Sequence, residues 1–204
     1  MIDVIPEGRS GDFVVEHYEV TEHQARMEAL RWAFTGNGSY SQKAGKYAVL
    51  KYVPVNSSQW SQRILMSDTP MEMESMESML RYAKGRVLVG GLGLGVVCLN
   101  LIAKQEVTEV LVVELERNVI QLVYPHLKKF DTQSKITVIN GDILNFQPVK
   151  GLKFDTIWFD IWDNICADNL EDMNKLHRRF RSRLVQGGYM NSWMRIECLR
   201  AKMR

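Results

Sequence analysis

Short apolar runs alternate with amphipathic segments from residue 86 onward. Five runs show little polar alternation and are predicted to be strands: residues 86–89, 109–115, 136–139, 154–161 and 189–193. Three segments place their apolar side chains at helical spacing: residues 96–104, 118–130 and 168–184. Because uninterrupted apolar strands are typical of sheets covered on both faces, this order predicts an α/β fold with a doubly wound, mostly parallel sheet.

The first 68 residues follow a different pattern, which we interpret as a small N-terminal mixed α/β extension to a domain at residues 69–204. Residues 13–20 and 47–53 are predicted to be strands, and residues 21–33 are predicted to be a helix. A turn is expected at residues 35–38, where the sequence reads Thr-Gly-Asn-Gly.

A further helix is predicted to begin after Thr69. Thr69 suits the capping position, Pro70 suits the first helical position, and Glu72 stands where a capping box needs an acid. The apolar side chains that follow share one helical face: Met73, Met76, Leu80 and Ala83. We expect the methionines of this face to pack in the core rather than to contact a cofactor.

The composition is that of an ordinary soluble protein, with 46% hydrophobic and 25% charged residues. The N-terminus lacks the basic start and apolar stretch of a signal peptide, and the uncharged run at residues 87–103 is too short and too glycine-rich to span a membrane. We therefore expect a cytoplasmic protein without membrane contact. The three cysteines and four histidines show no metal-ligand spacing, so free thiols and no metal are expected.

The first strand of the sheet ends in a turn that contains Gly90, Gly91, Gly93 and Gly95. Ligands of doubly wound sheets lie at the carboxyl ends of the strands, and glycines there let the backbone approach them closely. The dinucleotide fingerprint, begun at Gly91, requires a small residue at the position of Val96 and therefore fits poorly. The spacing of Gly91, Gly93 and Gly95 suits the nucleoside–methionine form of this turn, although an ordinary tight turn would use the same residues.

Acidic residues follow the second and third predicted strands. Glu114 ends the second strand and is the candidate for accepting both ribose hydroxyls, with Glu116 as the fallback. Asp142 follows the third strand and is the candidate for the exocyclic adenine amine, while Ile143 is expected to cover a face of the ring. The alternatives are a solvated carboxylate at Glu114 and ordinary turn chemistry at Asp142.

Two aspartates, Asp160 and Asp163, lie at and just after the end of the fourth predicted strand. Asp160 is expected beside the reactive end of a bound cofactor, and Asp163 is expected on the same side of the turn. Two carboxylates in this position are able to orient an amine nucleophile or to accept its proton, which makes both residues candidate catalytic groups. The alternative for Asp163 is that it only caps the following segment.

Residues 86–193 resemble the Rossmann-like core of the S-adenosylmethionine-dependent methyltransferases, and within that superfamily they are most similar to the spermidine synthase-like branch. The resemblance lies in four motifs in order: RVLVGGLGLGVV, VVELERNVI, NGD at 140–142 and DIWD at 160–163. It implies S-adenosylmethionine as the cofactor, with Glu114 at its ribose, Asp142 at its adenine and Asp160 near the transferred group.

The resemblance leaves the transferred group open. Aminopropyltransferases carry an aspartate inside the glycine loop and serines between the paired aspartates, whereas this chain has Leu92, Ile161 and Trp162 at such positions. Methyl transfer to an unidentified small-molecule or amine acceptor is therefore favoured, with aminopropyl transfer as the alternative. A third hypothesis is a non-catalytic interaction module with a basic C-terminal surface, since residues 175–204 hold nine basic residues and one acid. Nucleic acid is a possible partner of that surface but not the favoured one, because a solvated helix face explains these charges.

A homodimer is also expected. Methyltransferases of this superfamily usually continue past the fifth strand with a helix and two more strands, whereas only residues 194–204 follow here. The fifth strand would then expose an open edge, which proteins usually cover. Either the strands of residues 13–53 or a second copy of the chain would cover it.

Overall fold

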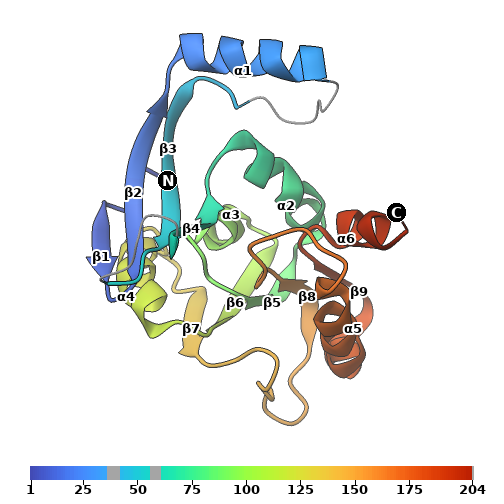
Figure 1. Cartoon of the computed structure of the whole chain (residues 1–204). Coiled ribbons are helices and arrows are strands. Elements are labelled where there is room, and N and C mark those ends of the chain that lie inside the picture. The colour runs from blue at the N-terminus through green and yellow to red at the C-terminus, as the bar shows by residue number, and fades with distance from the viewer. Residues whose placement is uncertain (36–41, 56–60, 204) are drawn as a thin grey trace.

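The computed structural model describes residues 1–35, 42–55 and 61–203, which form two sheets (Figure 1). All five strands of the larger sheet are parallel, in the order β7-β6-β5-β8-β9. They are β5 (Gly85–Gly90), β6 (Val107–Glu114), β7 (Ile136–Asn140), β8 (Phe154–Phe159) and β9 (Leu184–Ser192). Successive strands are added to one side of β5 and then to the other, as in a doubly wound sheet. The predicted fold class is confirmed.

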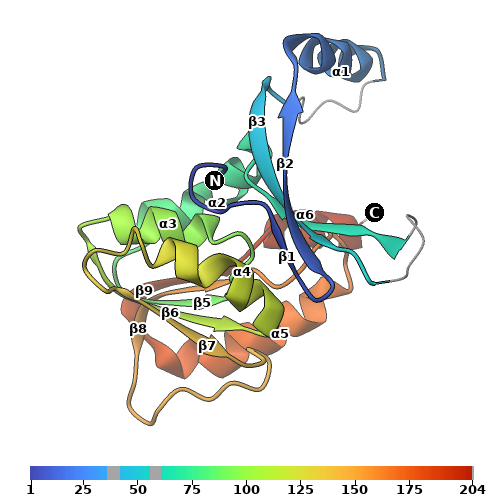
Figure 2. The same ribbon diagram turned by 90° about the vertical axis from the view of Figure 1, so that its left-hand side faces the viewer.

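Helices cover both faces of this sheet (Figure 2). One face is covered by α3 (Val96–Ala103) and α4 (Arg117–Leu127), and the other by α5 (Asn169–Phe180), which continues into the short 3-10 helix η2 (Arg181–Arg183). Helix α2 (Pro70–Tyr82) contacts α3 and buries Met76 and Met79 completely. Of the two methionines on the predicted face, Met76 is fully buried and Met73 is half-buried against the same core, so the expectation that they pack in the core is confirmed.

The start of α2 differs from the expected capping box. Pro70 does occupy the first turn, but neither Thr69 nor Glu72 makes the side-chain hydrogen bonds of such a box. The Thr69 hydroxyl instead lies 3.0 Å from the hydroxyl of Ser67. Glu72 instead lines the pocket described below, where its neighbours are the Trp193 indole and the backbone of Ser67.

The smaller sheet is antiparallel, in the order β1-β2-β3-β4. Its strands are β1 (Gly8–Ser10), β2 (Phe13–Val20), β3 (Gly45–Tyr52) and β4 (Arg63–Ser67). Strands β1 and β4 were not expected from the sequence. This sheet contacts α4 through β1 and β2, while α1 (Glu22–Thr35) stands at its far end (Figure 2). The expected turn at residues 35–38 lies almost wholly outside the described residues.

The outer edge of the larger sheet is formed by β9. Within the described ranges, β9 pairs with β8 alone, and α6 (Arg195–Lys202) follows it. The idea that the strands of residues 13–53 cover this edge is wrong, because β2 and β3 pair with each other in a separate sheet. The homodimer stays a prediction.

Candidate functional site

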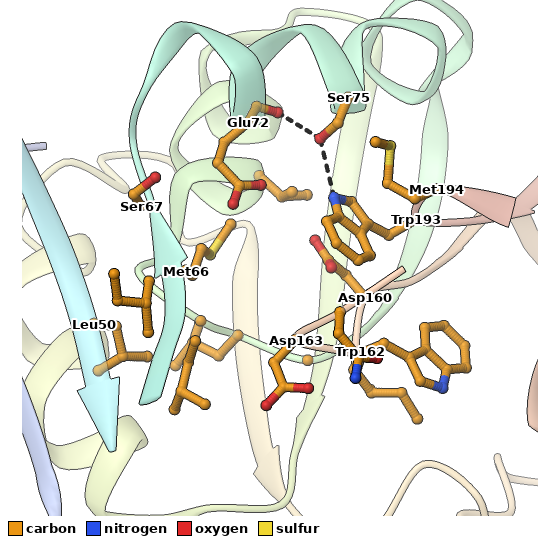
Figure 3. Close-up of a pocket in the computed structure, with 18 of the residues that line it drawn as sticks. Leu50, Met66, Ser67, Glu72, Ser75, Asp160, Trp162, Asp163, Trp193 and Met194 are labelled. Atoms are coloured by element: carbon orange, nitrogen blue, oxygen red, sulfur yellow. Dashed lines mark hydrogen bonds between the residues drawn. The ribbon is translucent and has the colours of Figure 1, made fainter. Parts of the chain in front are cut away.

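A pocket of about 1550 Å³ lies at the carboxyl ends of β5, β6 and β8. Its opposite wall is formed by β3, β4 and α2, so the two sheets enclose it together. Seven of the candidate residues from the sequence line it: Gly91, Gly93, Glu114, Asp142, Ile143, Asp160 and Asp163. Figure 3 shows the part of the pocket around Asp160. The parallel strands explain this convergence, because their carboxyl ends meet at one edge of the sheet.

The glycine loop approaches its neighbours so closely that side chains are excluded at two positions. Gly91 has a φ of 97°, and a Cβ there would collide with the carbonyl oxygen of Asp160. Gly93 has a φ of 51°, and a Cβ there would collide with the Sδ atom of Met66. The other two glycines do not line the pocket. A Cβ at Gly90 would lie 2.9 Å from Ile143, and one at Gly95 would meet Leu127, so both serve close packing.

Most N–H groups of this loop already have protein partners. Glu114 accepts from the N–H groups of Leu92 and Glu116 at 2.6 and 2.8 Å, one on each carboxylate oxygen. The N–H of Leu94 donates to the thioether of Met66 at 3.3 Å. The loop therefore lets a ligand approach the backbone closely, but it has few N–H groups left to donate to that ligand. Each Glu114 oxygen keeps lone-pair capacity for a further donor, such as a hydroxyl.

Glu114 is only 8% exposed, and its burial raises the pKa of the carboxyl group. The N–H groups of Leu92 and Glu116 oppose that rise by stabilising the charged form. Backbone N–H groups thus fix the Glu114 carboxylate beside the glycine loop. In this position it is suited to accept hydrogen bonds from the hydroxyl groups of a ligand. Sequence reasoning found Glu114 but missed Met66, which comes from the unexpected strand β4.

Asp142 both lines the pocket and organises its own turn. Its two oxygens accept from the N–H of Leu144 at 2.8 Å and from the side-chain amide of Asn145 at 2.5 Å. The turn chemistry raised as the alternative is therefore present, and it holds the carboxylate in place. Ile143 is 3% exposed and packs against Gly90.

Arg179 of α5 stabilises the same loop. Its guanidinium donates to the carbonyl oxygens of Ile143, Leu144 and Phe146. Arg183 similarly donates to the carbonyl oxygen of Val149 at 3.1 Å. Two members of the basic C-terminal segment thus bind the chain itself, which weakens the case for that segment as a binding surface.

The carboxylate that acts electrostatically on Asp160 is Glu72 of α2, and not Asp163 of the DIWD motif. Asp160 follows β8, and its backbone N–H bonds to the carbonyl oxygen of Gly90 at 2.7 Å. Burial, and after it the charge of Glu72, raise the pKa of Asp160 to about 7. Burial also raises the pKa of Glu72 to about 7, against the opposing effects of the Trp193 indole and the Ser67 backbone. Figure 3 shows both carboxyl groups beside Trp193.

Asp163 has a different partner. It lies at the rim of the pocket, where Arg63 of β4 approaches its carboxylate at 3.3 Å. The two side chains are 62% and 31% exposed, so the pair contributes little to stability. Asp160 and Asp163 line one pocket, as the sequence predicted. The carboxylate of Asp163, however, is already paired with Arg63.

Trp193 is held in place beside Glu72 and Asp160 (Figure 3). It extends the ladder of β8 and β9, since its N–H donates to the carbonyl oxygen of Phe159 at 2.8 Å. Its indole N–H donates to Ser75 at 3.1 Å, and Ser75 in turn donates to the backbone carbonyl of Glu72 at 2.6 Å (Figure 3). The helical pattern of α2 gave no signal that Ser75 would hold a tryptophan from the end of the chain.

Within residues 1–35, 42–55 and 61–203, no cluster of three histidine, cysteine or acidic side chains is arranged to hold a metal ion. No helix in these ranges is both long enough and apolar enough to cross a membrane.

No protein-family model matches the chain, and no curated protein matches it significantly. Among solved structures it is similar to YcgJ from Bacillus subtilis, at 20% identity and a TM-score of 0.45, over 58% of this chain and 50% of that one. It is similar to the N-methyltransferase NodS from Bradyrhizobium japonicum WM9, at 20% identity and a TM-score of 0.47, over 61% and 68% of the two chains. A third match is an rRNA methylase from Streptococcus thermophilus, at 12% identity and a TM-score of 0.46, over 60% and 69%. Similarity at this level concerns the arrangement of strands and helices.

Proposed function

We propose that the protein is an S-adenosylmethionine-dependent methyltransferase that acts on an acceptor still to be identified. The observation that carries this proposal is the convergence of the glycine loop, Glu114, Asp142 and Asp160 on one pocket. These groups come from the ends of β5, β6, β7 and β8, and each has the chemistry that one part of the cofactor requires.

Glu114 would accept the ribose hydroxyls, since its two oxygens accept from the N–H groups of Leu92 and Glu116 and retain lone-pair capacity. Asp142 would accept the adenine amine, and Ile143 would pack on the ring. Gly91 and Gly93 leave a path along the backbone that a side chain would block. The bound cofactor supplies an electrophilic methyl group on its sulfonium sulfur. Asp160 would lie beside the reacting atoms, where it is able to bind the acceptor or accept its proton.

Methyl transfer is preferred to aminopropyl transfer for two reasons. The interior of the glycine loop contains Leu92 and Leu94, which are 3% and 0% exposed, and no carboxylate is available there. The second aspartate of the DIWD motif is paired with Arg63. A cytoplasmic location belongs to the same proposal and is supported by the three free cysteines, which suit a reducing compartment.

Calorimetry with S-adenosylmethionine, its decarboxylated form and S-adenosylhomocysteine tests the proposal. S-Adenosylmethionine and S-adenosylhomocysteine should bind, and the decarboxylated form should bind more weakly. Glu114→Ala and Asp142→Ala should each weaken binding by roughly tenfold to a hundredfold, as expected for the loss of a charge-assisted hydrogen bond. The control is Glu109→Gln at the other end of β6, where an exposed pair with Arg86 is lost. Unchanged affinity in both site variants, or a preference for the decarboxylated form, would refute methyl transfer through this site.

A further inference from the structure

The pocket is strongly acidic. Its described lining contains three cationic side chains, Arg31, Lys43 and Arg63, and eight carboxylates: Glu28, Glu72, Glu74, Glu114, Glu116, Asp142, Asp160 and Asp163. Arg63 is already paired with Asp163. Such a cavity attracts cations and repels anions, because low-dielectric walls concentrate the field of the charges that line it. Cofactor binding would use Glu114 and Asp142, which leaves Glu72 without an assigned ligand and Asp160 facing an acceptor of unspecified chemistry.

Glu72 and Asp160 also lack a protein cation. Neither carboxylate takes part in any ion pair of the part of the chain that the structure describes. Burial raises the pKa of each carboxyl group to about 7, and the charge of Glu72 contributes to the rise at Asp160. Two buried acids without a counter-charge are costly to keep ionised, and a cationic ligand between them would remove that cost.

An unsatisfied donor lies at the same place. Trp158 of β8 is 1% exposed, and its indole N–H has no hydrogen-bond partner. It faces the Asp160 carboxylate closely enough to oppose the rise in that group's pKa, but it lies outside hydrogen-bonding geometry.

The walls around the two acids suit an organic cation. Trp193 is 8% exposed and is fixed by Ser75, so a rigid indole stands beside both carboxyl groups (Figure 3). Indole faces attract cations more strongly than other aromatic side chains do. On the side of the smaller sheet, Leu50 and Met66 provide an apolar surface that leads away from the acids (Figure 3).

From this arrangement we infer that Glu72 and Asp160 bind the acceptor as a protonated amine, with its apolar body lying along β3 and β4. One carboxylate would then take a proton from the ammonium group, which becomes a neutral amine with a free lone pair, while the carboxylate becomes a carboxylic acid. The other carboxylate would stay ionised and keep the amine in place. This inference rests on the proposed function and names the class of its acceptor. It also assigns to Glu72 the role that the sequence gave to Asp163.

Binding of hexylamine, monitored by tryptophan fluorescence at pH 8 with saturating S-adenosylhomocysteine, tests the inference. 1-Hexanol and hexanoate provide a neutral and an anionic probe of the same length. Hexylamine should bind at least tenfold more tightly than either, and Glu72→Gln and Asp160→Asn should each weaken it by at least tenfold. Glu74→Gln is the matched control, because it removes an exposed carboxylate of the same pocket and the same helix, and it should change the affinity less than threefold.

Hexanol or hexanoate binding as tightly as hexylamine would overturn the inference. Equal hexylamine binding by the wild type and Glu72→Gln would overturn it as well, and that variant decides the matter even if Asp160→Asn does not fold. S-Adenosylhomocysteine is titrated first into each protein. A wild type that binds it but not hexylamine contradicts the amine site alone, whereas a wild type that binds hexylamine but not the nucleoside contradicts the proposed function.

Discussion

Replacing Glu72 by glutamine should stabilise the folded protein clearly at pH 8 and by less than about 1 kcal/mol at pH 5. Burial raises the pKa of Glu72 from 4.5 to about 7. Below pH 4.5 the group is protonated in both the folded and unfolded states. Between pH 4.5 and 7 the unfolded chain releases the proton and the folded protein retains it, so the stability of the wild type falls as the pH rises.

The size of the effect follows from the same values. A rise of the pKa from 4.5 to about 7 corresponds to a cost of about 3 kcal/mol for the ionised group above pH 7. Glutamine has similar shape and does not titrate. The substitution also removes the negative charge that repels the Asp160 carboxylate, whose pKa is raised partly by Glu72. Because Glu72 is only partly buried, solvent screens part of this cost, and the net gain for Glu72→Gln at pH 8 should be about 1–3 kcal/mol.

Urea denaturation followed by tryptophan fluorescence at pH 5 and pH 8 measures this difference. Glu74→Gln is the control, because Glu74 is an exposed acid on the same helix. The control should shift the unfolding free energy by less than about 0.5 kcal/mol at both pH values, as exposed substitutions usually do. The reasoning is wrong if Glu72→Gln is no more stable than the wild type at pH 8 while the urea dependence of both proteins is the same.

Three further results are expected. Asp160→Asn should abolish turnover of labelled S-adenosylmethionine with an acceptor amine and keep S-adenosylhomocysteine affinity within a few-fold; a defect mainly in nucleoside binding would contradict this. Gly91→Ala should destabilise the fold by roughly 1–3 kcal/mol more than Gly151→Ala in urea denaturation, because both residues have a positive φ but only Gly91 has a neighbour for the new Cβ to strike. Sedimentation at micromolar concentration should give a dimer that covers β9; a strict monomer with protected β9 amides in hydrogen exchange would refute it.

The sequence alone was sufficient for the larger sheet and for the acids at its strand ends. Apolar runs separated by helical segments predicted β5 to β8 to within a few residues, because a strand covered on both faces requires side chains of one kind along its length. Glu114, Asp142 and Asp160 were found for a related reason. The carboxyl ends of parallel strands converge, so residues just beyond each run lie together whatever the details of packing.

Local patterns failed where a distant part of the chain supplied the partner. Glu72 has the spacing of a capping box, yet the pocket provides Trp193 and the Ser67 backbone as its neighbours. Asp163 has the spacing of a second catalytic acid, yet Arg63 reaches it from a strand that no pattern predicted.

The sequence therefore determined which residues end the strands of the larger sheet and which chemistry they bring to its edge. Only the tertiary structure decided that the second acid beside Asp160 is Glu72, that Trp193 lies beside both acids, and that Met66 contacts the glycine loop. The spacing of apolar residues along the sequence indicates only which face of its own helix or strand a residue lies on. The partner it meets depends on how the smaller sheet and α2 pack against the larger one, and that contact is made by segments far apart in the chain.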